Sequence, residues 1–430
     1  MNARVVYESL LKRYAELAYL EELRKLETIA HGDLWLVGGW VRCAFLGHVN
    51  YVGDIDCISS CTPEELSVLT ASHVPRAVRN FSGGLRFPLP DLNHIDLSST
   101  YTLSGDSSIA RSLEGFNASV NAVAIRLRDG KVVAANGALE DLNSRHFRVL
   151  GQEFHEKGIV AVLSDIEALS KFYGLIPNND SRTQAIVLRI ARERTRLSQL
   201  GSEDALVSAV DAIRNLVPPR ASAWLVRGFV RNALLRELSF WDDKDVVVDC
   251  EGQELIAHLS SNAFEYALNF HGNPKVCLGS GHMVDIWPIA DTGLSDELER
   301  YEFNVDAVAW DVNKRCVVDP LNASRDLKLR RLRLCCPIDG SSQRSVAYAA
   351  VKAAYLCLRH KFLPQDDRTI ELLRLEFPID GLLRKNAHRL ARELWCSNVP
   401  DICSRISWLR DFVGASPSVG LLLESAHHLP

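Results

Sequence analysis

Two pairs of aspartates in this sequence are spaced so that each pair could hold a metal ion. Asp54 and Asp56 lie in "DIDC", and Asp243 and Asp245 lie in "DKDV". On a strand, side chains at i and i+2 point to the same face, so each pair projects from one side of a sheet. Converging carboxylates repel one another unless a cation lies among them, and such hard oxygen ligands suit Mg²⁺ or Mn²⁺. The spacing therefore indicates two candidate metal sites.

A third aspartate could complete each site. Asp96 lies in "HIDLSST" and Asp285 in "MVDIWPI", and both segments alternate like strands. A neighbouring strand with such a residue would add a third carboxylate to the pair. Two ions held about 3.5–4 Å apart would stabilise the attacking and leaving oxygens of an in-line phosphoryl displacement. These residues therefore favour phosphoryl-transfer chemistry.

A glycine turn precedes the first aspartate pair, where a strand is expected to meet a helix. Gly38 and Gly39 in "LVGGWVR" would let backbone N–H groups approach a polyphosphate, and the helix N-terminus favours its charge. Arg42, one turn further along, could contact phosphate or brace the loop. Gly228 and Arg231 match these positions in the second half. This is a nucleotidyltransferase layout, with phosphates on the glycines, metals on the aspartates and an acceptor hydroxyl attacking the α-phosphorus.

The two sets of residues belong to a tandem repeat. The segment "WLVGGWVRCAFL" (35–46) aligns with "WLVRGFVRNALL" (224–235), and all three aspartates recur 189 positions later. Further on, "VNAVAIRLRDGKVV" (120–133) parallels "VDAVAWDVNKRCVV" (305–318) at an offset of 185. Self-similarity of this kind indicates two copies of one structural unit.

The expected fold class is α/β (α+β), with two tandem units that each combine a small mixed sheet with helices. A helical stretch follows each unit, and the prolines of "NLVPPRAS" mark the boundary before the second one. The predicted divisions are an N-terminal helix (1–33), a first domain (34–150), a helical segment and linker (151–220), a second domain (221–338) and a C-terminal helical segment (339–430).

The composition sets limits on partners and location. The chain has 430 residues, 47% of them hydrophobic, and a formal charge of −5, so nucleic acid would have to contact a local basic patch. "RIARERTR" is one such patch, with Arg189, Arg192 and Arg196 on one helical face. No segment is apolar enough to span a membrane and no signal peptide is evident. We expect a cytoplasmic protein with reduced thiols.

The ordered set "LVGGWVR…LG…DIDC…HIDLSST…SVNAVA…GALEDL" resembles the head domain of the CCA-adding enzyme and bacterial poly(A) polymerase family, in the polymerase β nucleotidyltransferase superfamily. The resemblance covers about residues 34–150 and, more loosely, 223–335. It implies two polymerase β-like domains that use Mg²⁺ (or Mn²⁺). It also implies site residues: metal ligands Asp54, Asp56, Asp243 and Asp245, third carboxylates Asp96 and Asp285, and triphosphate contacts Gly38, Gly39 and Gly228.

Several positions depart from the family's pattern. The aspartate of its Val-Arg-Asp motif is Cys43 in the first copy and Asn232 in the second. Its Arg-Arg-Asp segment reads "GFN" (115–117) and "RYE" (300–302), and Arg227 replaces the first glycine of the second copy. The base-selecting Glu-Asp-x-x-Arg pattern is matched poorly by "SDIEALSK". A housekeeping CCA-adding enzyme is therefore not expected.

Three functional interpretations follow. The first is a metal-dependent nucleotidyltransferase that moves NMP from an NTP to an acceptor, preferably an RNA or tRNA 3′ end, with the first copy catalytic. The second keeps this reaction but uses a protein side chain or a small molecule as acceptor. The third is a non-catalytic nucleotide- or RNA-binding scaffold. The six retained aspartates disfavour the third, because clustered carboxylates are costly to keep for structure alone.

Overall fold

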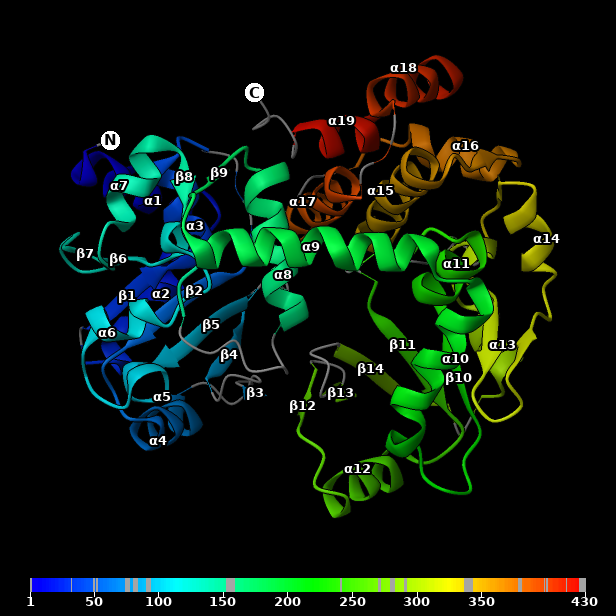
Figure 1. The fold of residues 1–430 in the computed structure, drawn as a ribbon, viewed down its shortest axis with the longest axis horizontal. Helices are drawn as coiled ribbons and strands as arrows, with labels where there is room; N and C mark the ends of the chain where they lie inside the picture. Colours follow the sequence, from blue (N-terminus) through cyan, green and yellow to red (C-terminus); the bar gives the residue numbers. More distant parts are fainter. Residues whose placement is uncertain are drawn as a thin grey trace.

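The computed structural model contains two seven-stranded sheets with the same strand order (Figure 1). It describes residues 2–31, 33–48, 51, 53–73, 78–79, 84–89, 94–151, 159–239, 242–269, 272–278, 283–289, 292–335, 343–377, 381–397, 399, 401–414 and 416–424. The first sheet has the order β3-β4-β5-β2-β1-β6-β7 and the second β12-β13-β14-β11-β10-β15-β16. The predicted fold class, two tandem mixed α/β units, is confirmed.

The strands of the first sheet are β1 (Leu34–Val37), β2 (Ile55–Ser59), β3 (Val78–Arg79), β4 (Leu85–Pro88), β5 (His94–Ser99), β6 (Val123–Arg126) and β7 (Val132–Ala134). Those of the second are β10 (Ala223–Val226), β11 (Lys244–Val248), β12 (Tyr266–Leu268), β13 (Pro274–Cys277), β14 (Met283–Pro288), β15 (Ala309–Asp311) and β16 (Cys316–Val318). Two short parallel pairs join β8 (His146–Phe147) to β9 (Ile176–Pro177) and β17 (Arg331–Leu332) to β18 (Leu363–Pro364).

The helices of the first half are α1 (Ala3–Glu16), α2 (Leu20–Ile29), α3 (Gly38–Phe45), α4 (Pro63–His73), α5 (Thr100–Ser104), α6 (Ile109–Glu114), α7 (Ala138–Ser144), α8 (Ile159–Lys171), α9 (Ser181–Gln199) and α10 (Ser202–Ile213). Those of the second half are α11 (Arg227–Leu235), α12 (Gly252–Ser261), α13 (Leu294–Glu299), α14 (Ala323–Lys328), α15 (Gln343–His360), α16 (Asp367–Arg374), α17 (Gly381–Cys396), α18 (Ile402–Val413) and α19 (Pro417–Glu424).

The N-terminal stretch, expected to be one helix over 1–33, forms the two helices α1 and α2. Ala18 lies between them with a φ of 58°. A left-handed residue cannot continue a right-handed helix, so the chain turns before α2 begins.

Strand pairing places the aspartates. β2 and β5 are parallel, with Asp56 opposite Asp96, and β11 and β14 are parallel, with Asp245 opposite Asp285. Ile55 and Cys57 flank Asp56 and are buried in the core, so the period-2 alternation turns its carboxylate to the other face. The apolar residues thus fix the direction in which the acids point.

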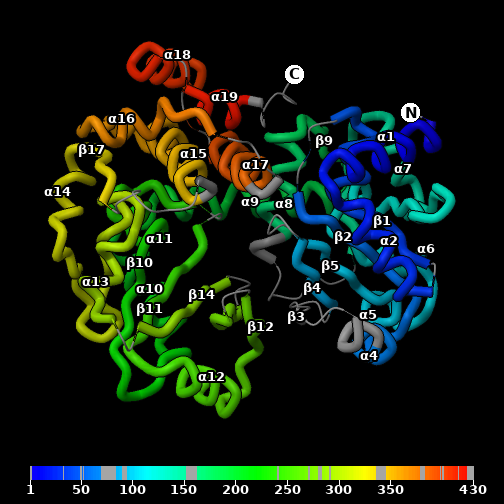
Figure 2. Tube along the Cα trace, turned by 180° about the vertical axis from the view of Figure 1, so that it is seen from behind, coloured from blue at the N-terminus to red at the C-terminus, as the bar shows by residue number. Residues whose placement is uncertain are grey.

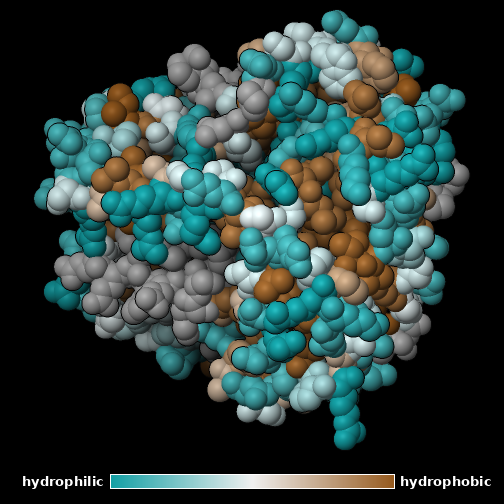
Figure 3. All heavy atoms as spheres, turned by 45° about the vertical axis from the view of Figure 1, so that its right-hand side comes forward, coloured by the Kyte–Doolittle hydropathy of each residue, from teal (hydrophilic) through white to brown (hydrophobic). Residues whose placement is uncertain are grey.

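Helix α17 connects the two units. It packs against α15, which follows the second sheet, and against α8, which follows the first. Figure 2 shows α17 near the middle of the molecule, between the two sheets. On the face seen in Figure 3, hydrophilic residues cover most of the surface and hydrophobic ones form smaller areas. Among the described residues, no helix is long and apolar enough to cross a membrane.

Candidate functional site

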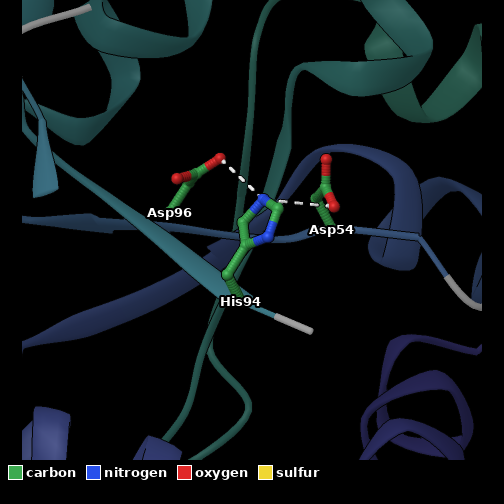
Figure 4. A group of neighbouring side chains, drawn as sticks. All are labelled: Asp54, His94 and Asp96. Atoms are coloured by element: carbon green, nitrogen blue, oxygen red, sulfur yellow. Dashed lines mark ion pairs between the residues drawn. The ribbon is translucent and has the colours of Figure 1, made fainter. Parts of the chain in front are cut away.

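In the first unit, two predicted aspartates meet around a histidine. The His94 Nε2 atom lies 3.3 Å from Asp54 Oδ1 and 3.6 Å from Asp96 Oδ2. Figure 4 shows the imidazole between the two carboxylates. One ligand atom from each of these residues lies within 4.8 Å of the others, so the three could hold a metal ion. Burial lowers the pKa of His94, but both carboxylates outweigh burial and raise it overall.

Asp56 lies beside this group and faces the glycine turn. Burial, together with the charges of Asp54 and Asp96, raises the pKa of Asp56 to about 8. Among the described residues, no hydrogen bond or ion pair engages its carboxylate. Asp56 is therefore the carboxylate with the most capacity to take a cation.

Basic side chains already neutralise the other two aspartates. Arg86 donates from Nε and Nη2 to the two oxygens of Asp96, at 2.8 and 2.7 Å. Lys385, from α17, forms an ion pair with Asp54. Desolvation alone would raise the pKa values of both acids. His94 and Lys385 instead hold the pKa of Asp54 below its usual range. Arg86 and His94 do the same for the pKa of Asp96.

A cavity of about 510 Å³ opens above these carboxylates, bordered by the glycine turn. Gly38 has a φ of +70°, and a Cβ placed on it would lie 2.6 Å from Asp56 Oδ2. A side chain there would be strained and would meet the carboxylate, so this position favours glycine. Helix α3 starts at Gly38 without a side-chain cap, and Gly38 and Gly39 line the cavity, so the first N–H groups of the helix are available as potential anion donors.

Arg42 lines the cavity and is held by buried contacts. Its guanidinium is buried, lies 4.3 Å from the centroid of the Tyr173 ring and donates to Asn121. Asn121 donates to Asn117, which donates to Asp165 on α8 at 3.0 Å. Arg42 therefore has the bracing contacts that were one of its two predicted roles.

The second unit brings its aspartates together with fewer partners. Burial raises the pKa of Asp245 to about 7 and also raises that of Asp243. Lys275 Nζ lies 2.8 Å from Asp285 Oδ2. Met283 stands where the first unit has His94, and no group of three metal ligands is found here within the described ranges. The cavity is smaller, about 290 Å³.

Arg227 changes the phosphate turn of the second unit. It has a φ of 59°, the conformation of Gly38, and its guanidinium lies 4.8 and 4.6 Å from the ring centroids of Trp287 and Tyr301. The two cation–π contacts offset part of the cost of a left-handed non-glycine residue. The turn of the second unit thus carries an arginine in contact with two aromatic rings.

An ion-pair network replaces the amide chain of the first unit. Arg231, the counterpart of Arg42, pairs with Asp306. Lys352 Nζ lies 3.0 Å from Asp306 Oδ2 and 2.9 Å from Glu302 Oε2. Asp306 and Glu302 match Asn121 and Asn117 at the 185-residue offset. Lysine and arginine hold the pKa of Asp306 at about 2 despite its burial.

Helix α17 borders both cavities. Lys385, His388 and Arg392 line the first, Glu393 lines the second, and Arg389 lines both. Residues three, four and seven apart share a helix face, so one helix presents basic groups to the first site along one side. His388 Nε2 lies 3.1 Å from the Tyr173 hydroxyl oxygen, which helps to fix α17 over the first cavity.

Sequence reasoning missed several of these residues. Arg86 and Lys275 lie 189 positions apart, as the aspartates do, so the repeat contained a signal for them. His94 was part of the "HIDLSST" segment, which was interpreted only as a strand. Lys385 carried no local signal, because it reaches Asp54 from 331 positions further along the chain.

The donor set fits a hard divalent cation. Asp56 has an unengaged carboxylate, and its raised pKa shows that this pocket favours neutralisation of the charge. Asp54 opens onto the same cavity, with 43% of its side chain exposed. Carboxylate oxygens are the ligands that Mg²⁺ and Mn²⁺ prefer. A cation at Asp54 would compete with the Lys385 ammonium.

Comparison with known proteins supports the resemblance. No family model matches the chain. It is 32% identical over 117 residues to a CC-adding tRNA nucleotidyltransferase of Geobacter sulfurreducens, a match that covers 26% of this chain and 27% of that protein. Because the match spans about a quarter of that protein, it does not by itself establish a shared activity. It does confirm the similarity to tRNA nucleotidyltransferases that the glycine and aspartate motifs indicated.

Solved structures give weaker likenesses. The Bacillus stearothermophilus CCA-adding enzyme in complex with CTP is 16% identical, covers 50% of this chain and 53% of its own, and has a TM-score of 0.38. The Thermotoga maritima CCA-adding enzyme complexed with tRNA is also 16% identical, with coverage of 56% and 62% and a TM-score of 0.33. Scores this low carry no argument. The similarity therefore rests on the 117 residues matched to the CC-adding tRNA nucleotidyltransferase.

Proposed function

We propose that this protein is a metal-dependent nucleotidyltransferase that moves NMP from an NTP to an RNA or tRNA 3′ end in the cytoplasm. The observation that carries the proposal is that Asp54, Asp56 and Asp96 share one cavity with the turn at Gly38 and Gly39. The sequence similarity to a CC-adding tRNA nucleotidyltransferase supports an RNA acceptor.

Each residue has a role in this reaction. The N–H groups at the start of α3 bind the triphosphate, and Asp54 and Asp56 hold Mg²⁺ or Mn²⁺, which supplies positive charge to the phosphates when bound. Asp96 is assigned to positioning, because Arg86 occupies both of its oxygens and its lowered pKa makes it a weak base. The acceptor hydroxyl gives its proton to solvent and its oxygen bonds to the α-phosphorus, while the bond from the α-phosphorus to the bridging oxygen breaks and pyrophosphate leaves with the electron pair.

The first unit is the proposed catalytic copy. Its cavity is the larger, and its turn carries glycine where the second has Arg227. The second unit keeps its aspartates, but Lys275 pairs with Asp285, and a buried ion-pair network around Asp306 lines the same cavity. We assign it a supporting role in binding the acceptor or in maintaining the fold.

The test is incubation of the purified protein with each labelled NTP, Mg²⁺ or Mn²⁺, and total RNA. The variant Asp54→Asn/Asp56→Asn is compared with the matched variant Asp243→Asn/Asp245→Asn. Label should enter RNA and be lost only in the first variant. Equal loss in both variants would assign catalysis to both units, and label on protein would identify a protein acceptor instead.

A second candidate function is a non-catalytic nucleotide- or RNA-binding scaffold. The ion pairs of Lys385 with Asp54 and of Arg86 with Asp96 favour it, because they neutralise the carboxylates without a metal. Absence of transfer with every nucleotide and metal, together with retained nucleotide binding, would select this function over the transferase.

A further inference from the structure

Helix α9 concentrates positive charge on an otherwise acidic chain. Its 19 residues, "SRTQAIVLRIARERTRLSQ", contain five arginines, one glutamate, and neither lysine nor aspartate. The helix therefore carries a formal charge of +4, while the whole chain carries −5. The rest of the chain must then carry −9, so α9 stands out as a local basic element.

Three of the arginines form a straight stripe. Arg182, Arg189 and Arg196 are seven residues apart, which is about 20° short of two full helical turns and a rise of about 10.5 Å. All three are exposed, as is Arg192 beside the stripe. The stripe is therefore about 21 Å long and faces solvent.

The opposite side of α9 is fixed to the protein. Thr183 and Ile190 are buried. Arg194 pairs with Glu167 on α8 and donates to the carbonyl of Cys396 on α17. Figure 1 shows α9 on the outer face, running from the first unit towards the second. The helix is thus held rigidly with its stripe outward.

Most of this charge has no partner within the protein. In the described ranges, no ion pair joins Arg182, Arg189 or Arg192 to a carboxylate. Arg196 lies 2.7 Å from Glu193, but its side chain remains 57% exposed. Exposed pairs of this kind contribute little and are easily exchanged for another anion.

We propose that this stripe, Arg182, Arg189 and Arg196, together with the adjacent Arg192, binds the phosphate backbone of an RNA strand. All of its cations are arginines, whose planar guanidinium groups pair with phosphate through two hydrogen bonds. A row of equally spaced charges on a straight helix suits a polyanion with regularly repeated phosphates better than the irregular charges of a folded protein.

Helix α9 is linked to the first cavity through α8. Helix α8 packs against α9 and lines that cavity through Asp165, Ala168 and Leu169. Packed helices are about 8–10 Å apart, and the stripe faces away from α8, so RNA on the stripe would be separated from the carboxylates by both helices. The idea that the RNA 3′ end enters this cavity rests on the proposed function, whereas binding to the stripe does not.

The test is fluorescence anisotropy with a labelled, mixed-sequence single-stranded RNA of about 12 nucleotides. The stripe variant is Arg182→Gln/Arg189→Gln/Arg196→Gln, and the control is Arg128→Gln/Arg214→Gln/Arg220→Gln, which removes three exposed arginines outside α9. The stripe variant should bind at least about tenfold more weakly at low salt. The magnitude of its slope of log K against log salt should decrease by about 2, because each of the three lost phosphate contacts contributes about 0.7 to that slope.

A third variant, Arg182→Lys/Arg189→Lys/Arg196→Lys, changes the same three residues but keeps their charge. It should keep the salt slope, which shows that the loss in the stripe variant comes from charge and not from misfolding. Equal affinity and slope in the stripe variant and the control would overturn the proposal. So would a polyglutamate chain that displaces RNA equally well per charge, since the partner would then be an acidic protein. The assay contains no NTP and no divalent metal, so its result is separate from that of the transferase test.

Discussion

The two units of this protein have the same strand order and the same three aspartates, but different surroundings for them. Above the first set is a cavity of about 510 Å³ beside Gly38, and above the second is one of about 290 Å³ beside Arg227. Strand register places two of the three carboxylates opposite each other in both units. The fold thus preserves the aspartates in both units, whereas the side chains around them set the size of the cavity.

The polar networks next to the two sites also differ, because the residues that follow the arginine are neutral in the first unit and charged in the second. In the first, Arg42 is followed by two neutral amides, Asn121 and Asn117. In the second, the matching positions are Asp306 and Glu302, which bind Lys352. Ion pairs buried in this way are costly to disrupt, because removal of one charge leaves its partner buried and unpaired. The second site is therefore built more for stability than for ligand exchange.

The largest expected effect comes from removing one charge of this buried ion-pair network. Lys352→Met should lower the free energy of unfolding by about 3 kcal/mol, because it removes a cation from the buried Asp306 and from Glu302. Urea unfolding measures the change, and Lys361→Met, at an exposed position, is the control. A loss below about 1 kcal/mol, as for a surface pair, would show that the second network is not a stabilising element.

Exchange of the two turns is the next test. Gly38→Arg gives the first unit the turn of the second, and we expect transfer to fall at least about 100-fold, roughly 2.7 kcal/mol in barrier height. The reasons are the φ of +70° and the 2.6 Å approach to Asp56 Oδ2. The reciprocal variant, Arg227→Gly, should change transfer less than about threefold.

Both turn variants are compared in the labelled-NTP assay, with thermal unfolding as a check on folding. Transfer that survives in Gly38→Arg would place catalysis elsewhere. An equal loss in Arg227→Gly would mean that the second unit takes part in the reaction, and the contrast between the two turns would lose its functional meaning.

The pH dependence of stability offers a smaller effect. Burial raises the pKa of Asp56 to about 8 and that of Asp245 to about 7, well above unfolded aspartate. The folded protein therefore holds protons that the unfolded chain has released, so these two groups make stability fall as the pH rises from about 4, the unfolded pKa, to about 8. Without metal, we expect the free energy of unfolding to drop by on the order of 1 kcal/mol per pH unit in this window.

Asp56→Asn should flatten this pH dependence, and added Mg²⁺ should offset it in the unsubstituted protein. Denaturant unfolding at pH 6, 7 and 8, with and without EDTA, measures both. An unfolding free energy that changes equally with pH in Asp56→Asn would show that another group titrates, and the first site would lose this argument for a cation.

The sequence predicted the parts of the site that follow from local pattern. Alternation of apolar residues around Asp56 gave the face of the strand, and the 189-residue offset gave both sheets and all six aspartates. It could not predict Lys385, because no local spacing records which distant helix packs over a cavity. Arg42 was predicted to contact phosphate or to brace the turn, and the buried contacts with Tyr173 and Asn121 are those of a brace.

The smallest expected effect concerns the cation on Asp54. Lys385→Met removes the ammonium that competes with a metal, and a charge about 4 Å away in a water-like medium contributes about 1 kcal/mol. We therefore expect Mn²⁺ to bind the first site about fivefold more tightly, as measured by electron paramagnetic resonance of free Mn²⁺. Lys275→Met removes a lysine beside Asp285 in the second site and should add no Mn²⁺ binding, because Arg227 and Lys352 still line that smaller cavity. Unchanged affinity in Lys385→Met would mean that the lysine does not stand in for a metal, and Asp54 would then be a carboxylate that the protein itself neutralises.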